Sequence, residues 1–116
     1  MTDKTIDIPI YDCKLRVIIT KPKKLNEQLK EVGYKGRVKG CNGIALRYPD
    51  TPQYYTMALT TKADAGTIAH ESLHMVINIM RDVDIAFDYD NSEPMTYLLQ
   101  FIVSCVTKIK EDEDNT

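Results

Sequence analysis

The sequence contains only two histidines, and both fall in one short stretch. His70 and His74 are separated by three residues, and Glu71 directly follows the first, which gives the pattern His-Glu-x-x-His. On an α-helix, residues four apart lie on one face, so both imidazoles could bind one metal ion. Zinc (Zn²⁺) suits this site because imidazole is a preferred ligand and a catalytic site uses three protein ligands plus water. We therefore expect a zinc cofactor, with Glu71 acting on the bound water.

The pattern also occurs by chance, so its interpretation depends on whether the surrounding segment is helical. Residues 68–80 are mostly apolar and contain neither proline nor glycine. Asp64 or Thr67 could cap the start of a helix, and Arg81 would lie at its negative end. The apolar positions cover a wide stripe, which predicts a helix buried on most sides.

A third protein ligand must come from elsewhere in the chain, and it must be a cysteine or a carboxylate. Glu93 lies nineteen residues after His74, where a second helix is expected to begin. From His74 to the end of the first helix the chain rises ~10 Å, at about 1.5 Å per residue, and the loop that follows is long enough to return that distance. Asp88 and Asp90 are alternatives, either as ligands or as acceptors of the outer N–H of a ligand histidine. Glu93 could equally be an acid that is favourable at a helix start.

The rest of the chain predicts one α+β domain over residues 1–110, followed by a disordered acidic tail at 111–116. Residues 15–20 are β-branched and apolar, which is typical of a buried strand, and Pro9 suggests an edge position before it. Short apolar runs around a turn predict an antiparallel hairpin. The expected elements are extended segments within 5–20, a helix at 23–32, hairpin strands at 44–48 and 54–61, and helices at 68–80 and 92–110.

The segment from Thr67 to His74, followed by Glu93 to Leu99, resembles the small gluzincin zinc metallopeptidases. The similarity is greatest to the single-domain minigluzincin and phage- or prophage-encoded forms, and it covers about residues 43–106. It implies a zincin-like α+β fold, zinc held by His70, His74 and Glu93, and Glu71 as the general base. It also implies a peptide or protein substrate and a bacterial or phage-encoded origin. The scattered cysteines and an N-terminus without signal-peptide form predict a cytoplasmic location.

The same resemblance implies a substrate-binding edge strand and shows one departure from the family. The edge strand would comprise Ile44, Ala45, Leu46, Arg47 and Tyr48, and substrate would add to it in antiparallel orientation. Thermolysin-like relatives carry an Asp four residues after the ligand Glu, whereas this chain has Tyr97. Tyr97 could donate its phenolic proton to an oxyanion, or it could be a core tyrosine.

Charge and cysteine content restrict the other classes of function. The net charge of −2 gives no global attraction to nucleic acid, although seven basic residues gather between Lys21 and Lys39. A non-catalytic phage or mobile-element accessory protein, with that basic region as its binding surface, is the main alternative. Cys13, Cys41 and Cys105 form no Cys-x-x-Cys pair, so we expect three small buried residues in a reducing compartment. No apolar run is long enough to span a bilayer.

Overall fold

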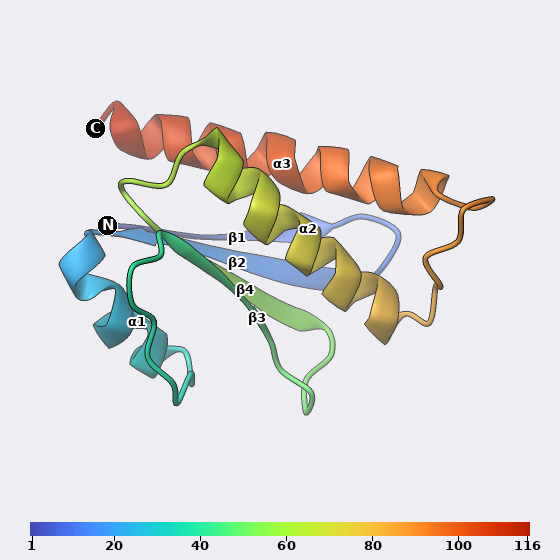
Figure 1. Ribbon diagram of the computed structural model, residues 1–116, viewed down its shortest axis with the longest axis horizontal. Coiled ribbons are helices and arrows are strands. Elements are labelled where there is room, and N and C mark those ends of the chain that lie inside the picture. The colour runs from blue at the N-terminus through green and yellow to red at the C-terminus, as the bar shows by residue number, and fades with distance from the viewer.

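The computed structural model describes all 116 residues as a mixed sheet with helices on both faces (Figure 1). The alternating and β-branched segments form the strands, and the segments of helical period form the helices. The strands are β1 Thr2–Ile8, β2 Cys13–Thr20, β3 Gly43–Arg47 and β4 Tyr54–Thr60; the helices are the short 3-10 helix η1 Pro22–Lys24, α1 Leu25–Glu31, α2 Ala65–Asp82 and α3 Glu93–Asp114.

The sheet has the strand order β1-β2-β4-β3, so β1 and β3 are its edges. β2 pairs with β4 in parallel, and the two outer pairings are antiparallel. The β2–β4 register places Leu15 opposite Tyr55, and Ile19 opposite Leu59. These apolar side chains lie on one face of the central strands, which explains why that face is covered by helices.

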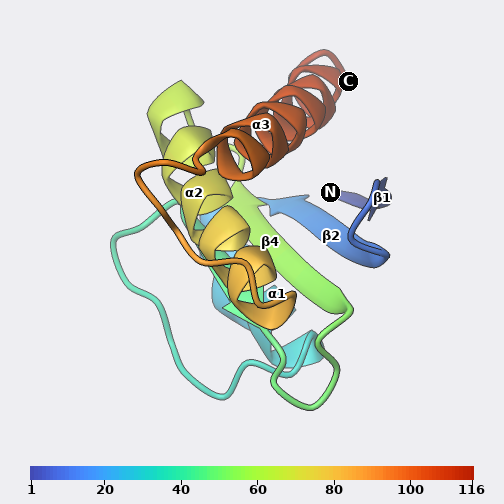
Figure 2. The same ribbon diagram turned by 90° about the vertical axis from the view of Figure 1, so that its right-hand side faces the viewer.

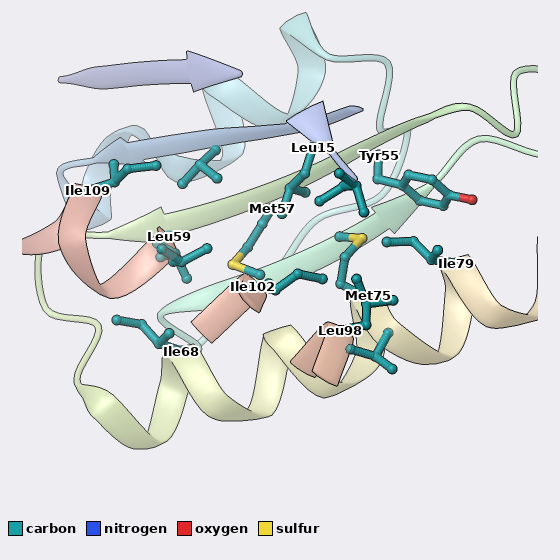
Figure 3. Packing of buried hydrophobic residues seen from close by; sticks show 14 of the residues in the cluster. Leu15, Tyr55, Met57, Leu59, Ile68, Met75, Ile79, Leu98, Ile102 and Ile109 are labelled. Carbon is teal, nitrogen blue, oxygen red and sulfur yellow. The ribbon is translucent and has the colours of Figure 1, made fainter. Parts of the chain in front are cut away.

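Helices α2 and α3 cover this face of the sheet and enclose the main core. Figure 2 shows α3 lying toward β1 and β2, with α2 on the other side toward β4. The core between them is closed by Met57 from the sheet, Met75 and Ile79 from α2, and Ile102 from α3, all without measurable exposure (Figure 3). The sheet and α3 therefore bury one side of α2, but Leu73 and Ile77 are 42% and 41% exposed, so α2 is not buried on most sides as the apolar stripe of residues 68–80 predicted.

The opposite face of the sheet carries α1. Leu25 and Leu29 of α1 pack on Ala58 of β4. The segment after α1 has no regular structure until β3, but Asn26 anchors it: the Asn26 amide donates to Val38 O at 3.0 Å, and Asn26 Oδ1 accepts from Val38 N at 2.9 Å. This segment leads directly into the edge strand next to α2.

The predicted hairpin and both longer helices are confirmed, and three details differ. The N-terminal extended region is two strands, because residues 9–12 form a turn in which Ile10 and Asp12 have φ of 74° and 50°. α3 continues to Asp114, through residues assigned from the sequence to a disordered tail, and Lys110 Nζ bonds Asp114 at 2.7 Å. Cys41 is exposed and Cys105 is only partly buried, although burial was expected for all three cysteines. No helix in the structure has the length and apolarity needed to cross a bilayer.

Candidate functional site

Helix α2 begins at a side-chain cap, as expected from the sequence. Asp64 Oδ1 accepts from Thr67 N at 2.8 Å and from Thr67 Oγ1 at 3.0 Å. These hydrogen bonds hold the pKa of Asp64 below its usual value. The cap therefore fixes the first turn of α2, from which His70 and Glu71 project in the next turn.

The other end of α2 is held by a network that the sequence did not reveal. Asp82, the last residue of the helix, carries a negative charge where the helix dipole disfavours one. Arg47 of β3 compensates: its Nε donates to Asp82 Oδ1 at 2.8 Å, and Tyr55 Oη lies 2.7 Å from Asp82 Oδ2. Burial alone would raise the pKa of Asp82, but the hydrogen bonds from Arg47 and Tyr55 outweigh it, so the pKa is lowered. Burial, followed by the bond to Asp82, raises the pKa of Tyr55.

The two imidazoles lie together on the outer surface of α2, as their spacing predicts. The ring centroids of His70 and His74 are 4.8 Å apart, with an angle of 71° between the ring planes. The side chain of His70 is 68% exposed. Neither ring makes a hydrogen bond with another part of the protein, so both keep their nitrogen lone pairs available for a metal or a substrate.

Glu71 differs sharply from its two neighbours. The residue is only 8% exposed, yet its carboxylate accepts no hydrogen bond from the protein. The imidazole of His70 lies closest among the basic side chains, with 3.9 Å between its Nε2 and Glu71 Oε2, which exceeds hydrogen-bonding distance. The carboxylate oxygens are not closed off from solvent, because the one buried side-chain polar atom without a partner is Ser72 Oγ. A water molecule or a cation can therefore reach Glu71 from the surface.

Glu71 lines a hollow of about 340 Å³ where the start of α2 meets the start of β3. At Gly43, a Cβ would lie 3.0 Å from Glu71 Cγ and 3.1 Å from Thr67 Cγ2, so the close approach of strand and helix requires glycine. The walls of the hollow combine a thiol, an amide, an imidazole and a carboxylate; its lining residues are Cys41, Asn42, Gly43, Gly66, Thr67, His70 and Glu71.

The expected third ligand is not part of this hollow. Glu93 and Tyr97 line a different, largely apolar hollow with Ile10 and other residues of the β1–β2 turn. In Figure 1, α3 begins on the side of the molecule where α2 ends. No three His, Cys, Asp or Glu residues are arranged so that they could hold one metal ion together. The two histidines thus fit zinc in type and spacing, and the structure does not bring Glu93 to them.

The other predicted site residues also lie apart from the histidines. Tyr97 is 66% exposed, so it is not a core tyrosine, and it does not share the histidine hollow. Asp88 and Asp90 belong to the exposed loop before α3. Asp88 Oδ1 accepts from Asp90 N at 3.0 Å, and neither carboxylate is hydrogen-bonded to a histidine.

Strand β3 is an edge of the sheet, as expected. It pairs only with β4, packs against α2, and leaves its other edge without a strand. Tyr48 lies beyond the end of the strand, and its hydroxyl is 3.0 Å from Val32 O and 2.9 Å from Thr56 Oγ1. The strand therefore comprises Gly43–Arg47, and Tyr48 instead links it to the α1 side of the sheet.

Sequence reasoning missed Cys41 as a residue of the site. A signal was present: Cys41 directly precedes the turn pair Asn42-Gly43 and follows Gly40, a context typical of an exposed turn.

Comparisons with known protein families, with curated proteins and with solved structures each found no match to this chain.

Proposed function

We propose that this protein is a zinc-dependent hydrolase of peptide bonds in which His70 and His74 bind the metal and Glu71 is the general base. The observation that carries the proposal is the grouping of three side chains on neighbouring turns of α2: the rings of His70 and His74 lie 4.8 Å apart without hydrogen-bond partners, and Glu71 Oε2 lies 3.9 Å from His70 Nε2.

The chemistry follows from the roles of these side chains. When bound, zinc lowers the pKa of a water toward ~7 and polarises the substrate carbonyl. Glu71 takes the proton of the attacking water and then gives it to the leaving amine. A third protein ligand is still required, and Glu93 in that role stays a prediction from the family resemblance.

The free edge of β3 would align the substrate. An extended peptide could pair its backbone with Gly43–Arg47 as an additional antiparallel strand. Because Gly43 lies against Glu71, a peptide on this edge would pass the hollow that contains the general base. The substrate class that this geometry favours is therefore an extended, unfolded segment of peptide or protein.

The test compares metal content and cleavage of a peptide library, with and without a chelator. We expect Glu71→Gln to keep zinc and lose about 10²–10⁴-fold in cleavage rate, the usual effect of removing a general base. His70→Ala and His74→Ala should lose both zinc and cleavage. Asn78→Ala, one turn beyond His74 on the same helix, is the matched control and should change neither. Full activity of Glu71→Gln would remove Glu71 as the base.

A second candidate is a non-catalytic partner-binding protein of zincin-like fold. The position of Glu93 and Tyr97 away from the histidines favours this alternative. In that case the wild-type protein would cleave no peptide in the presence of zinc. Charge reversal of Lys23 and Lys24, in the basic region that would form the binding surface, would abolish partner binding, while Glu71→Gln would not.

A further inference from the structure

We propose that the apolar hollow between the β1–β2 turn and the start of α3 is a docking site for a positively charged segment of a partner protein, which inserts an apolar side chain there. This hollow shares no residue with the one that contains His70 and Glu71. The inference therefore does not depend on the proposed function.

The hollow is well suited to an apolar anchor. Its volume of about 420 Å³ lies in the range of ordinary ligand sites. Glu93 is the one charged residue in its lining, and the other walls are mainly apolar or aromatic; they include Ile10, Tyr11, Pro94, Tyr97 and Phe101. Ile10 and Tyr97 are both largely exposed. Large apolar side chains that share one exposed hollow are typical of an interaction site, unlike single ones scattered over a surface.

Ile10 is held in a conformation that is costly for its residue type. Tyr11 N donates to Pro9 O at 2.8 Å across Ile10, whose φ is 74°. A γ-turn with positive φ at its centre is rare and strained, and a β-branched residue is especially unfavourable there. Buried residues on each side, Ile8 and Cys13, fix the turn. The structure thus keeps an isoleucine in a strained position where it is 92% exposed, which indicates a role for the side chain outside the fold.

The surroundings of the hollow carry negative charge on both elements that form it. Residues 82–107 contain five acidic residues and no lysine, arginine or histidine. Arg47 neutralises one of them, Asp82, and the other four take part in no ion pair. These four are Asp84, Asp88, Asp90 and Glu93. On the facing turn, Asp12 is exposed. Charge complementarity therefore requires a positively charged partner.

The distribution of these acids favours a polypeptide over other occupants. They are spread over the loop before α3 and the β1–β2 turn, so several separate positive charges are needed to match them. Repulsion disfavours nucleic acid and anionic lipid surfaces. A second copy could offer its own basic region at residues 21–39, but α1, which lies within that region, is at the opposite end of the molecule from the start of α3 (Figure 1). Such a contact would be head to tail and would not close into a dimer.

The test titrates the 116-residue protein into a short fluorescent peptide of lysine and leucine, followed by fluorescence anisotropy. We expect saturable binding that weakens as salt is added, because salt screens opposite charges. Two matched peptides separate the contributions: one has glutamate in place of lysine, and the other has serine in place of leucine. Each should bind at least ~10-fold more weakly, since central anchors of an interface commonly contribute that much. A chelator should leave binding unchanged.

Substitutions in the hollow locate the site. Tyr97→Ala and Ile10→Gly should each weaken binding at least ~5-fold. Leu73→Ala is the matched control, because it removes another exposed apolar side chain, on α2, and should bind as the wild type does. Ile10→Gly should also raise the urea midpoint, because glycine adopts positive φ without strain. A variant that is more stable yet binds more weakly cannot be explained by loss of folded protein.

A second pair of variants tests the charge. Asp90→Asn combined with Glu93→Gln should weaken both the binding and its dependence on salt. Glu111→Gln combined with Asp112→Asn makes the same change of charge at the far end of α3 and should have little effect.

Four results would overturn the inference. The first is no saturable binding of the lysine–leucine peptide, and the second is equal binding of either matched peptide. The third is unchanged binding in both Tyr97→Ala and Ile10→Gly. The fourth is a wild-type protein that self-associates in sedimentation experiments and becomes monomeric in Tyr97→Ala, because a second copy would then be the occupant.

Discussion

Gly43→Ala is the substitution that most directly tests the contact between the edge strand and the site helix. The added Cβ would lie 2.9 Å from Leu59 Cδ2, 3.0 Å from Glu71 Cγ and 3.1 Å from Thr67 Cγ2. Favourable carbon–carbon contacts lie at about 3.5–4.0 Å, so each of these side chains must move by roughly 0.5–1 Å. The strand and helix would therefore be pushed apart at the position of the general base.

The expected cost follows from two opposing effects. Overpacking of a well-filled contact costs about 1–3 kcal/mol. Replacing glycine by alanine restricts the unfolded chain and returns about 0.4–1 kcal/mol. The net prediction is that Gly43→Ala lowers the free energy of unfolding by about 1–2 kcal/mol. Displacement of Glu71 should also lower cleavage activity, if the proposed function holds.

Gly66→Ala is the matched control, because it adds the same methyl group on the other side of the hollow. Its nearest neighbour would be Asp64 Oδ1 at 3.4 Å, an ordinary contact. Alanine favours the helix over glycine, so this variant should stabilise the protein by roughly 0.5–1 kcal/mol. Urea unfolding measures the stability of both variants: a shift of the transition midpoint, with an unchanged dependence of the unfolding free energy on urea concentration, reports a change in stability. The reasoning is refuted if Gly43→Ala is as stable as the wild type, or more stable.

Two further substitutions test how α2 is held. Asp82→Asn should destabilise the protein by about 1–3 kcal/mol at neutral pH, because the charge-assisted bond from Arg47 is lost. Folding lowers the pKa of Asp82, so the stability that its charge contributes is fully present above the unfolded pKa of about 4 and is lost as the pH falls through the folded pKa. The urea midpoint should therefore fall less between pH 7 and pH 3 in Asp82→Asn than in the wild type. An equal fall in both proteins would contradict this. Ser72 is fully buried and its Oγ has no hydrogen-bond partner, so Ser72→Ala should stabilise the protein by about 1 kcal/mol; a lower thermal midpoint would show that the hydroxyl is satisfied in solution.

The sequence was sufficient for most of the local structure of this protein, although it did not predict that α3 continues to Asp114. The apolar periods of residues 68–80 predicted α2, and the alternation of Tyr55, Met57 and Leu59 predicted one buried face of β4, because both patterns depend only on neighbours along the chain. Asp64 was recognisable as a cap for the same reason. The spacing of His70 and His74 placed their rings together, since a helix brings residues four apart onto one face.

Contacts between distant segments were decided by the tertiary structure alone. Whether Glu93 reaches the histidines depends on how α3 packs on the sheet, and the loop before α3 is long enough to place Glu93 either near the histidines or far from them. The approach of Cys41 to His70 and the pairing of Arg47 with Asp82 depend on β3 lying beside α2. Local spacing carries no information on such contacts, because the free energy that selects them comes from burial of the core as a whole.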